Sequence, residues 1–200
     1  MINEHISSSL KIHSWIESKL DGIDIPKNSR SLISVLCFDV VIEHHYATLC
    51  LIREKIYGSA FTLARPLFET FVRGVWIKNC ATDGEIESYK NDKFSNKFGE
   101  IVKDIEGIEA FKSGALSSLK KNGWDAMCSY THGGILQISR RFNNSEILPD
   151  YIEEEVVEVI KLAQSFALLS VIQIAAEINK VDLANEALEL LHKFEIFKKE

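Results

Sequence analysis

The sequence is poor in proline and glycine, the residues that form tight turns and interrupt helices and strands. It has only three prolines and ten glycines in 200 residues, and no run in which apolar and β-branched residues alternate with polar ones. Alternation of that kind is what a half-buried strand requires, and no internal repeat or low-complexity segment is present either. These absences exclude a β-rich or repeat architecture. The sequence therefore predicts an all-α fold, a single-domain helical bundle over residues 1–200 with long core helices and a short-helix insertion.

Metal-binding patterns are also lacking. The four cysteines form no C-x-x-C pair and fall mostly in apolar helical stretches, which is typical of reduced core thiols in a cytoplasmic protein. Asp39 and Glu43 lie one helical turn apart, but Tyr46 stands where a di-iron Glu-x-x-His motif needs histidine. We therefore expect no bound metal and no cofactor.

Positive charge is scarce as well. The net charge is −6 and the pI is about 5.6, which argues against a generally basic nucleic-acid surface and leaves RNA binding to a local arginine patch. The first residues, MINEHISSSLKIHSW, contain no signal-peptide core. The most apolar late stretch, Phe166 to Ala176, is too short to cross a bilayer. We expect a cytoplasmic protein without a membrane segment.

Apolar periodicity and capping signals divide the chain into helices. Residues 85–121 carry more charge than the rest of the chain, and their apolar periodicity is weaker. We expect this region to form short helices, to be more mobile and to act as a flap over the polar site described below. Pro66 lacks a backbone N–H and predicts a kink near Thr62 to Arg65. The predicted longer helices are Asn3–Leu20, Ser29–Ile56, Tyr57–Ala81, Trp124–His132, Tyr151–Asn179 and Asp182–Phe197.

A charged row runs along one of these helices. Arg65, Glu69 and Arg73 follow one another at intervals of four, so they share one face, and Trp76 projects onto the same arc. Two interpretations fit this row. It is either a solvated helix face with weak ion pairs, or the wall of a cleft in which Glu69 holds two guanidinium groups with donors left for an anion.

A second unusual segment is SYTHGGILQISRR, from Ser129 to Arg141. The chain has six arginines, and four of them fall in these two segments. His132 is either a helix C-terminal residue before a glycine cap or a functional group with Ser129 three residues away on the same face. No acid at a helical spacing completes a triad within this segment, which argues against a serine hydrolase. We predict that His132 meets Arg65 or Glu69 across the bundle and that Arg140 reaches the same pocket.

The second predicted helix is apolar over most of its circumference. His45 on this helix is either a satisfied core or interface histidine or an acid/base candidate. The last long helix also has a wide apolar arc. Two such helices present more apolar surface than one core absorbs, so we expect a homodimer or a complex with a partner protein.

The segment GSAFTLARPLFETFVRGVWI, with His44 and His45 upstream and SYTHGG downstream, resembles a bacterial family of unknown function. The family's helix is similar to R-P-L-x-E-x-x-x-R-x-x-W and is followed by Ser-x-x-His. More broadly the chain resembles HEPN-type helical domains, although it lacks their signature of Arg followed four to six residues later by His.

The HEPN-type resemblance implies a bacterial toxin or phage-defence factor that acts on RNA as a metal-independent ribonuclease. The expected catalytic residues are His132, Arg65 and Glu69. The alternative is a non-catalytic helical interaction or anion-sensing module. The expected substrate-binding residues are Arg73, Ser129, Trp76, Arg140 and His45.

Overall fold

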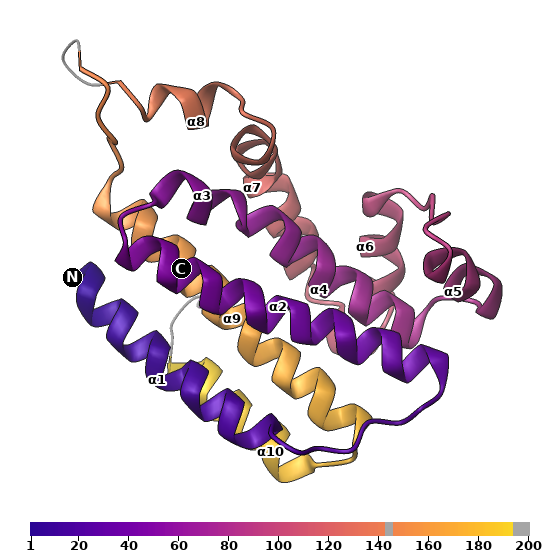
Figure 1. The fold of residues 1–200 in the computed structure, drawn as a ribbon. Coiled ribbons are helices and arrows are strands. Elements are labelled where there is room, and N and C mark those ends of the chain that lie inside the picture. Colours follow the sequence, from indigo (N-terminus) through magenta and orange to yellow (C-terminus); the bar gives the residue numbers. More distant parts are fainter. Residues whose placement is uncertain (143–145, 194–200) are drawn as a thin grey trace.

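A computed structural model of the chain describes residues 1–142 and 146–193, and all the regular elements of these residues are helices. The all-α prediction is therefore confirmed (Figure 1). The last helix was expected to end at Phe197, and its final four residues lie outside the described part of the chain. The elements are α1 (Ile2–Leu20), α2 (Ser29–Arg53), α3 (Tyr57–Thr62), α4 (Ala64–Asn79), α5 (Asp83–Lys90), α6 (Phe98–Glu106), the 3-10 turn η1 (Glu109–Phe111), α7 (Ala115–Thr131), α8 (Ile135–Ser139), α9 (Glu153–Glu177) and α10 (Val181–Lys193).

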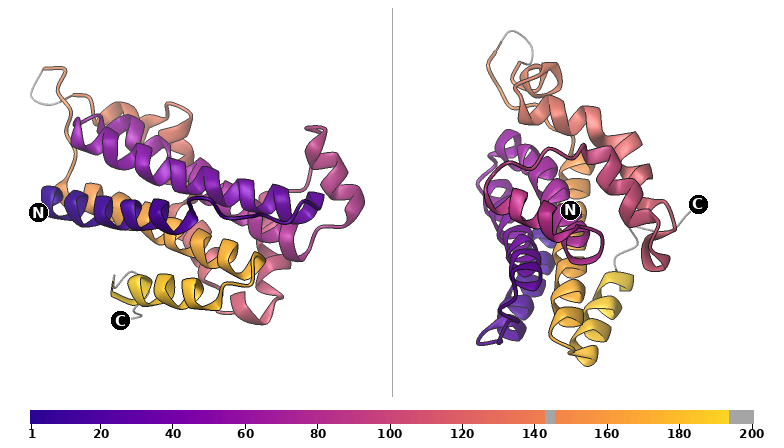
Figure 2. Two further views of the ribbon diagram at one scale, coloured as in Figure 1. Left: turned by 60° about the horizontal axis from the view of Figure 1, so that its bottom comes forward. Right: turned by 90° about the vertical axis from the view of Figure 1, so that its right-hand side faces the viewer.

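Three long helices, α2, α4 and α9, form the centre of the bundle. α1 packs on α2 and α9, and α10 packs on α9, whereas α6, α7 and α8 lie on the other side (Figures 1 and 2). The inner faces meet through phenylalanine rings: the centroid of Phe71 lies 5.9 Å from that of Phe38 and 5.0 Å from that of Phe166. Gly74 lets α2 approach closely, because a Cβ there would lie 2.8 Å from the Phe38 ring.

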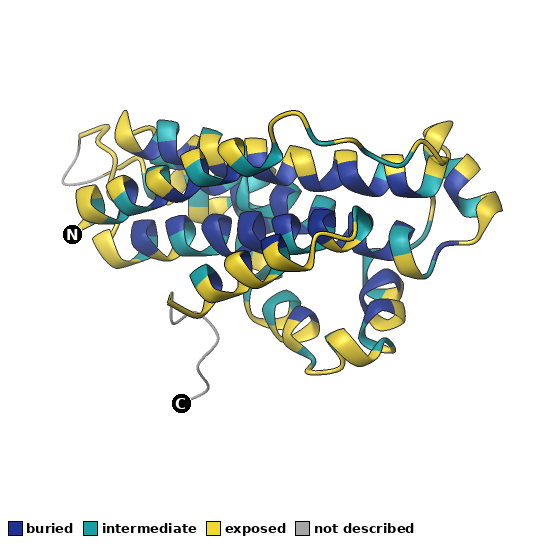
Figure 3. Ribbon diagram, turned by 90° about the horizontal axis from the view of Figure 1, so that it is seen from below, coloured by how far each residue is buried: buried dark blue, intermediate teal, exposed yellow. Residues whose placement is uncertain are grey.

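By length and composition alone, the two longest helices are long and apolar enough to cross a membrane. In α2 and α9, 50% and 61% of the most apolar 18 residues are buried inside the bundle. The apolar stretch of α9 is also longer than the segment from Phe166 to Ala176 that the sequence singled out. Viewed from below, the helices place their buried residues towards the bundle axis and their exposed residues outwards (Figure 3).

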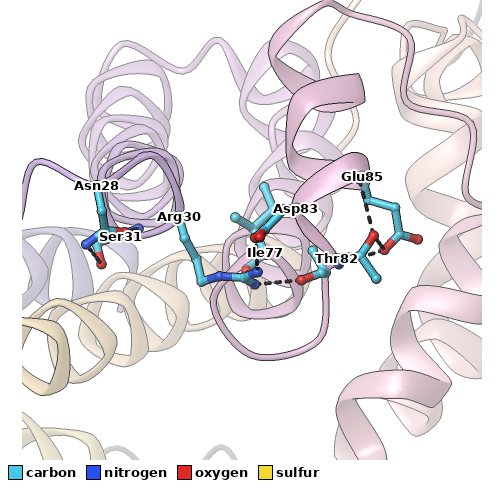
Figure 4. Close-up of polar contacts among 8 residues, drawn as sticks. Asn28, Arg30, Ser31, Ile77, Thr82, Asp83 and Glu85 are labelled. Carbon is cyan, nitrogen blue, oxygen red and sulfur yellow. Dashed lines mark hydrogen bonds and ion pairs between the residues drawn. The ribbon is translucent and has the colours of Figure 1, made fainter.

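Arg30 connects the start of α2 to the end of α4. Its guanidinium group donates to the carbonyl oxygens of Ile77 and Ala81 at 2.8 and 2.7 Å and to Asp83 at 3.0 Å (Figure 4). The carbonyls at a helix C-terminus have no partner within the helix, so this arginine satisfies them. Thr82 and Glu85 then form a capping box that starts α5.

The short-helix insertion is attached to the bundle through buried residues. Ile86 of α5 and Ile101 and Ile105 of α6 are buried in the same core cluster as α4. The predicted mobility of residues 85–121, and their role as a flap, stay predictions. The insertion covers the C-terminal half of α4, which places α6 beside the charged row.

One predicted boundary is wrong. The sequence suggested two helices separated by Asn122-Gly123, whereas α7 runs without a break from Ala115 to Thr131. A glycine inside a helix costs about 1 kcal/mol relative to alanine, and the packing of Leu116 and Met127 in the core offsets it. Tertiary packing thus overrides the local breaker signal.

Candidate functional site

The site begins at the break caused by Pro66. α3 ends at Thr62 and α4 starts at Ala64, which agrees with the predicted kink. Because Pro66 has no N–H, the carbonyl of Thr62 loses its partner within a continuous helix. The hydroxyl of Thr131, at the end of α7, lies 3.4 Å from this carbonyl oxygen and 2.8 Å from that of Met127.

Further hydrogen bonds hold the end of α7 and the start of α8 against α3. The Thr62 hydroxyl lies 3.2 Å from the carbonyl oxygen of Tyr130. The amide of Gln137 in α8 donates to Thr62 Oγ1 at 3.3 Å and to the Gly58 carbonyl at 3.4 Å. These contacts fix the chain on both sides of His132 and bring it beside the first turn of α4.

Glu69 holds both arginines of the charged row. Arg65 Nε donates to Oε1 and Arg73 Nη2 donates to Oε2, each at 2.7 Å. The exposed fractions are 13% for the Glu69 side chain, 21% for Arg65 and 33% for Arg73. The row is therefore half-buried, and its two guanidinium groups against one carboxylate leave a net positive charge.

Arg65 is also fixed by aromatic packing. Its Cζ lies 4.9 Å from the centroid of the Trp124 ring of α7, within the range of a cation–π contact. On α6, Phe98 stacks on Trp124 with a centroid separation of 4.7 Å and an interplanar angle of 16°. Two elements thus hold the guanidinium plane of Arg65, and Glu69 fixes its rotation.

His132 contacts Arg65 directly. Nε2 of the exposed imidazole is hydrogen-bonded to Nη1 of Arg65, so the predicted meeting of the two segments is found. A guanidinium group can only donate, so Nε2 is the acceptor. A side chain with a lone pair directed at a cationic group is suited to accept a proton once an anion takes the guanidinium donors.

Ser129 has a structural position. Its Oγ accepts a hydrogen bond from the backbone N–H of Leu136 at 3.0 Å, and its carbonyl accepts one from Gly134 at 2.7 Å. A Cβ on Gly134 would lie 2.5 Å from Ser129 Oγ, and Gly133 has φ of +66°. The two glycines therefore permit a tight turn between α7 and α8, in which the Ser129 hydroxyl accepts a hydrogen bond from the first turn of α8.

Two other predicted site residues lie elsewhere. Trp76 is 1% exposed and its Nε1 donates to Asp104 of α6 at 2.9 Å, because the insertion covers that end of α4. Arg140 pairs with Glu155 of α9 at 2.5 Å. The structure does not bring either residue to the cluster of Arg65 and His132.

His45 lies deep between α1 and α2. It is 0% exposed, its Nε2 is hydrogen-bonded to Ser9 Oγ at 2.8 Å, and its Nδ1 is buried without a hydrogen-bond partner. Burial, aided by the neighbouring His13 ring, lowers the pKa of His45 to about 3. His45 is therefore a neutral core residue near pH 7, and its ring does not reach the surface, where it could bind a substrate or exchange a proton with one.

Several residues of the site were missed by sequence reasoning. Trp124 and Thr131 are the clearest, because each lies on α7 and contacts α4 or α3. Trp124 at the Arg65 face could have been suspected from the rarity of tryptophan, of which the chain has three. Nothing in the local sequence pairs Thr131 with a carbonyl 69 positions away.

The described residues offer no obvious metal centre. Within residues 1–142 and 146–193, no group of three or more His, Cys, Asp or Glu side chains is arranged to hold a metal ion. The Arg65–His132 cluster itself contains a single carboxylate, and that carboxylate is bound to two arginines. The cluster is suited to bind an anion through its guanidinium donors.

Comparisons with known proteins give one match. Searches of curated proteins and of solved structures found no match. A family model, described as a family of unknown function (DUF6988), matches residues 38–197, which include the charged row of α4 and the Ser129–His132 segment. The chain therefore belongs to the DUF6988 family of unknown function.

Proposed function

We propose that this protein is a metal-independent ribonuclease of the HEPN-like toxin or phage-defence type. The observation that supports this function best is the direct contact of His132 Nε2 with the Arg65 guanidinium group. In this proposal Arg65 and Arg73 bind a phosphodiester, His132 transfers protons, and Glu69 positions the arginines.

The donors needed for phosphate are present. A guanidinium group has five N–H donors, and Arg65 uses two of them, towards Glu69 and His132. Its remaining donors, with those of Arg73, can bind two non-bridging oxygens. When a phosphate oxygen also takes Nη1 of Arg65, the bond to His132 is lost and the lone pair of Nε2 is free.

The chemistry needs no metal. Nε2 of His132 accepts the proton of a ribose 2′-hydroxyl while that oxygen attacks the adjacent phosphorus. The bond from phosphorus to the 5′-oxygen breaks, and the imidazolium returns its proton to this leaving oxygen. The products are a 2′,3′-cyclic phosphate and a 5′-hydroxyl, so all atoms and protons balance. Arg65 and Arg73 stabilise the charge that develops on the phosphorane oxygens.

The test is cleavage of a fluorescent RNA oligonucleotide by purified protein in the presence of EDTA. We expect cleavage of RNA but not of the matching DNA, which lacks the 2′-hydroxyl. His132→Ala should reduce the rate by about 10²–10⁴-fold, the usual contribution of a general acid/base, and Arg65→Ala by about 10²–10³-fold. His192→Ala on α10 and Arg53→Ala on α2, both at exposed positions, serve as matched controls.

Expression in a bacterial host supplies an independent readout. A ribonuclease toxin should arrest growth, and His132→Ala should relieve the arrest at equal protein level. Cleavage that survives His132→Ala, or that requires a divalent cation, would contradict the proposal.

A second candidate is an anion-binding module without chemistry. The observation that favours it is the single imidazole at the cluster, because one histidine must then serve as both base and acid. This candidate predicts that the protein binds RNA or inorganic phosphate without cleavage. Binding would then be lost in Arg65→Ala and Arg73→Ala but retained in His132→Ala.

A further inference from the structure

A hollow lies beside α7, and its lining does not include Arg65 or His132. It is a cleft of about 590 Å³ between α7 and α9, closed at one end by α3 and α8. That volume lies within the range of small-molecule sites, about 300–1,000 Å³. Trp124 faces Arg65, whereas Gly123, Ala126 and Met127 line the cleft, so different residues of α7 contribute to the two sites.

The walls of the cleft are mainly apolar. α7 contributes two small residues, Gly123 and Ala126, to the lining, and Met127 Cε would lie 2.9 Å from a Cβ on Gly123. A larger side chain in place of Ala126 would occupy part of the cleft. The principal apolar residues of the lining are Phe61, Ala64, Leu119, Met127, Val159 and Leu162.

The polar end of the cleft has an unused acceptor. Glu155 Oε1 accepts a hydrogen bond from Arg140 at 2.5 Å, whereas Glu155 Oε2 is buried and has no hydrogen-bond partner. A buried oxygen without a donor costs free energy. The Glu155 side chain is 34% exposed and lines the cleft, so a ligand that donates to this carboxylate is favoured. The carboxylate and the arginine neutralise each other.

The remaining charges of the lining also balance. Glu158 and Lys161 of α9 have opposite signs, as do Glu155 and Arg140. A charged ligand would therefore meet no excess of the opposite charge. An anion would have to compete with Glu155 for Arg140, and a cation would meet Arg140 and Lys161 as well as the carboxylates.

We propose that this cleft binds an uncharged, mainly apolar small molecule that donates an N–H or O–H group to Glu155. The apolar body of the ligand lies against Ala126, Met127 and Leu162. The lining of the cleft contains none of the cluster residues Arg65, Glu69, Arg73 and His132. This proposal therefore does not depend on whether the protein cleaves RNA.

The first experiment uses the neutral dye N-phenyl-1-naphthylamine, an apolar molecule with one N–H group. We expect saturable fluorescence enhancement by the full chain with a micromolar Kd. Ala126→Phe fills the cleft and should weaken binding by about tenfold or more, the loss expected when a ligand no longer fits an apolar site. Ala115→Phe, at an exposed position of the same helix, is the matched control and should leave binding unchanged.

The second experiment tests the hydrogen bond to Glu155. The N-methylated dye lacks the N–H group, and we expect it to bind about tenfold more weakly to the wild type, since a charge-assisted bond is lost. Glu155→Gln should shrink this preference and, because Arg140 is released, should strengthen binding of the anionic dye 1-anilinonaphthalene-8-sulfonate. Glu158→Gln is the control for the loss of one negative charge.

Hydrogen exchange then locates the dye. Protection should appear in α7 and the first half of α9 and be absent from α1 and α10. If Ala126→Phe loses its helical circular dichroism, Ala126→Leu replaces it. Absence of saturable binding by the wild type, equal affinity for the neutral and the sulfonated dye, or unchanged binding in a folded cleft-filling variant would each overturn the proposal.

Discussion

Two histidines of this protein lie in opposite environments. His45 is completely buried between α1 and α2, and burial lowers its pKa to about 3, so it stays neutral and inert. His132 is exposed at the end of α7 and is bonded to a guanidinium group. The comparison teaches that access and a charged neighbour, more than residue type, make a histidine available for chemistry.

The largest expected difference is in stability. His45→Ala should lower the free energy of unfolding by about 3 kcal/mol, because it leaves a cavity and an unpaired Ser9 hydroxyl. His132→Ala should cost less than about 1 kcal/mol, since only a helix-terminal residue is lost. Urea denaturation of both variants checks this order. Equal losses of unfolding free energy would contradict the assignment of His45 to the core and of His132 to an exposed helix end.

A second comparison lies within the charged row. Glu69→Ala should destabilise by about 2–3 kcal/mol, because Arg65 and Arg73 then face each other on a half-buried surface without a counter-charge. Glu69→Gln, which keeps the volume, separates the loss of charge from the loss of packing. If Glu69→Ala costs under about 0.5 kcal/mol in thermal or urea unfolding, the row behaves as a solvated face.

A pH titration of stability tests the buried environment of His45. The pKa of His45 is about 3 in the folded chain and about 6.5 when unfolded. The unfolded state therefore binds the proton more tightly, so stability is fully present above pH 6.5 and is lost as pH falls. Between pH 6.5 and 5 we expect a loss of about 1.5 kcal/mol from this residue.

His45→Gln can still bond Ser9 but cannot titrate. The difference in unfolding free energy between wild type and His45→Gln should therefore shrink or reverse as the pH falls to 5. His13 also has a pKa lowered by burial, and it is present in both proteins. A difference that stays constant with pH would mean that His45 does not titrate between the folded and unfolded states.

The smallest expected effect is that of Arg73→Ala. Its side chain is 33% exposed and makes one ion pair, so its removal should cost about 0.5 kcal/mol, like other exposed pairs. The same variant should still weaken anion binding if the proposed phosphate site is correct. A loss equal to that of Glu69→Ala would show that the row is a buried network.

Local patterns predicted much of the fold. The long helices, the break before Pro66 and the alignment of Arg65, Glu69 and Arg73 all follow from spacing along one helix. The contact of His132 with Arg65 was inferred from the scarcity of arginine. Failures came from distant segments: α6 covers Trp76 and turns it into a core residue, and α9 supplies Glu155, which draws Arg140 away. Neither partner is visible from the local sequence.

The contact between Arg65 and His132 has a consequence for the order of folding. Glu69 and the two arginines come together as soon as α4 forms, since only four residues separate each pair. His132 must instead close a loop of 67 residues, whose entropic cost is met only after α7 packs on the bundle. Contacts of this kind form late and open first when a chain fluctuates. Mild heating or denaturant should therefore disconnect His132 while the helices of the bundle remain folded.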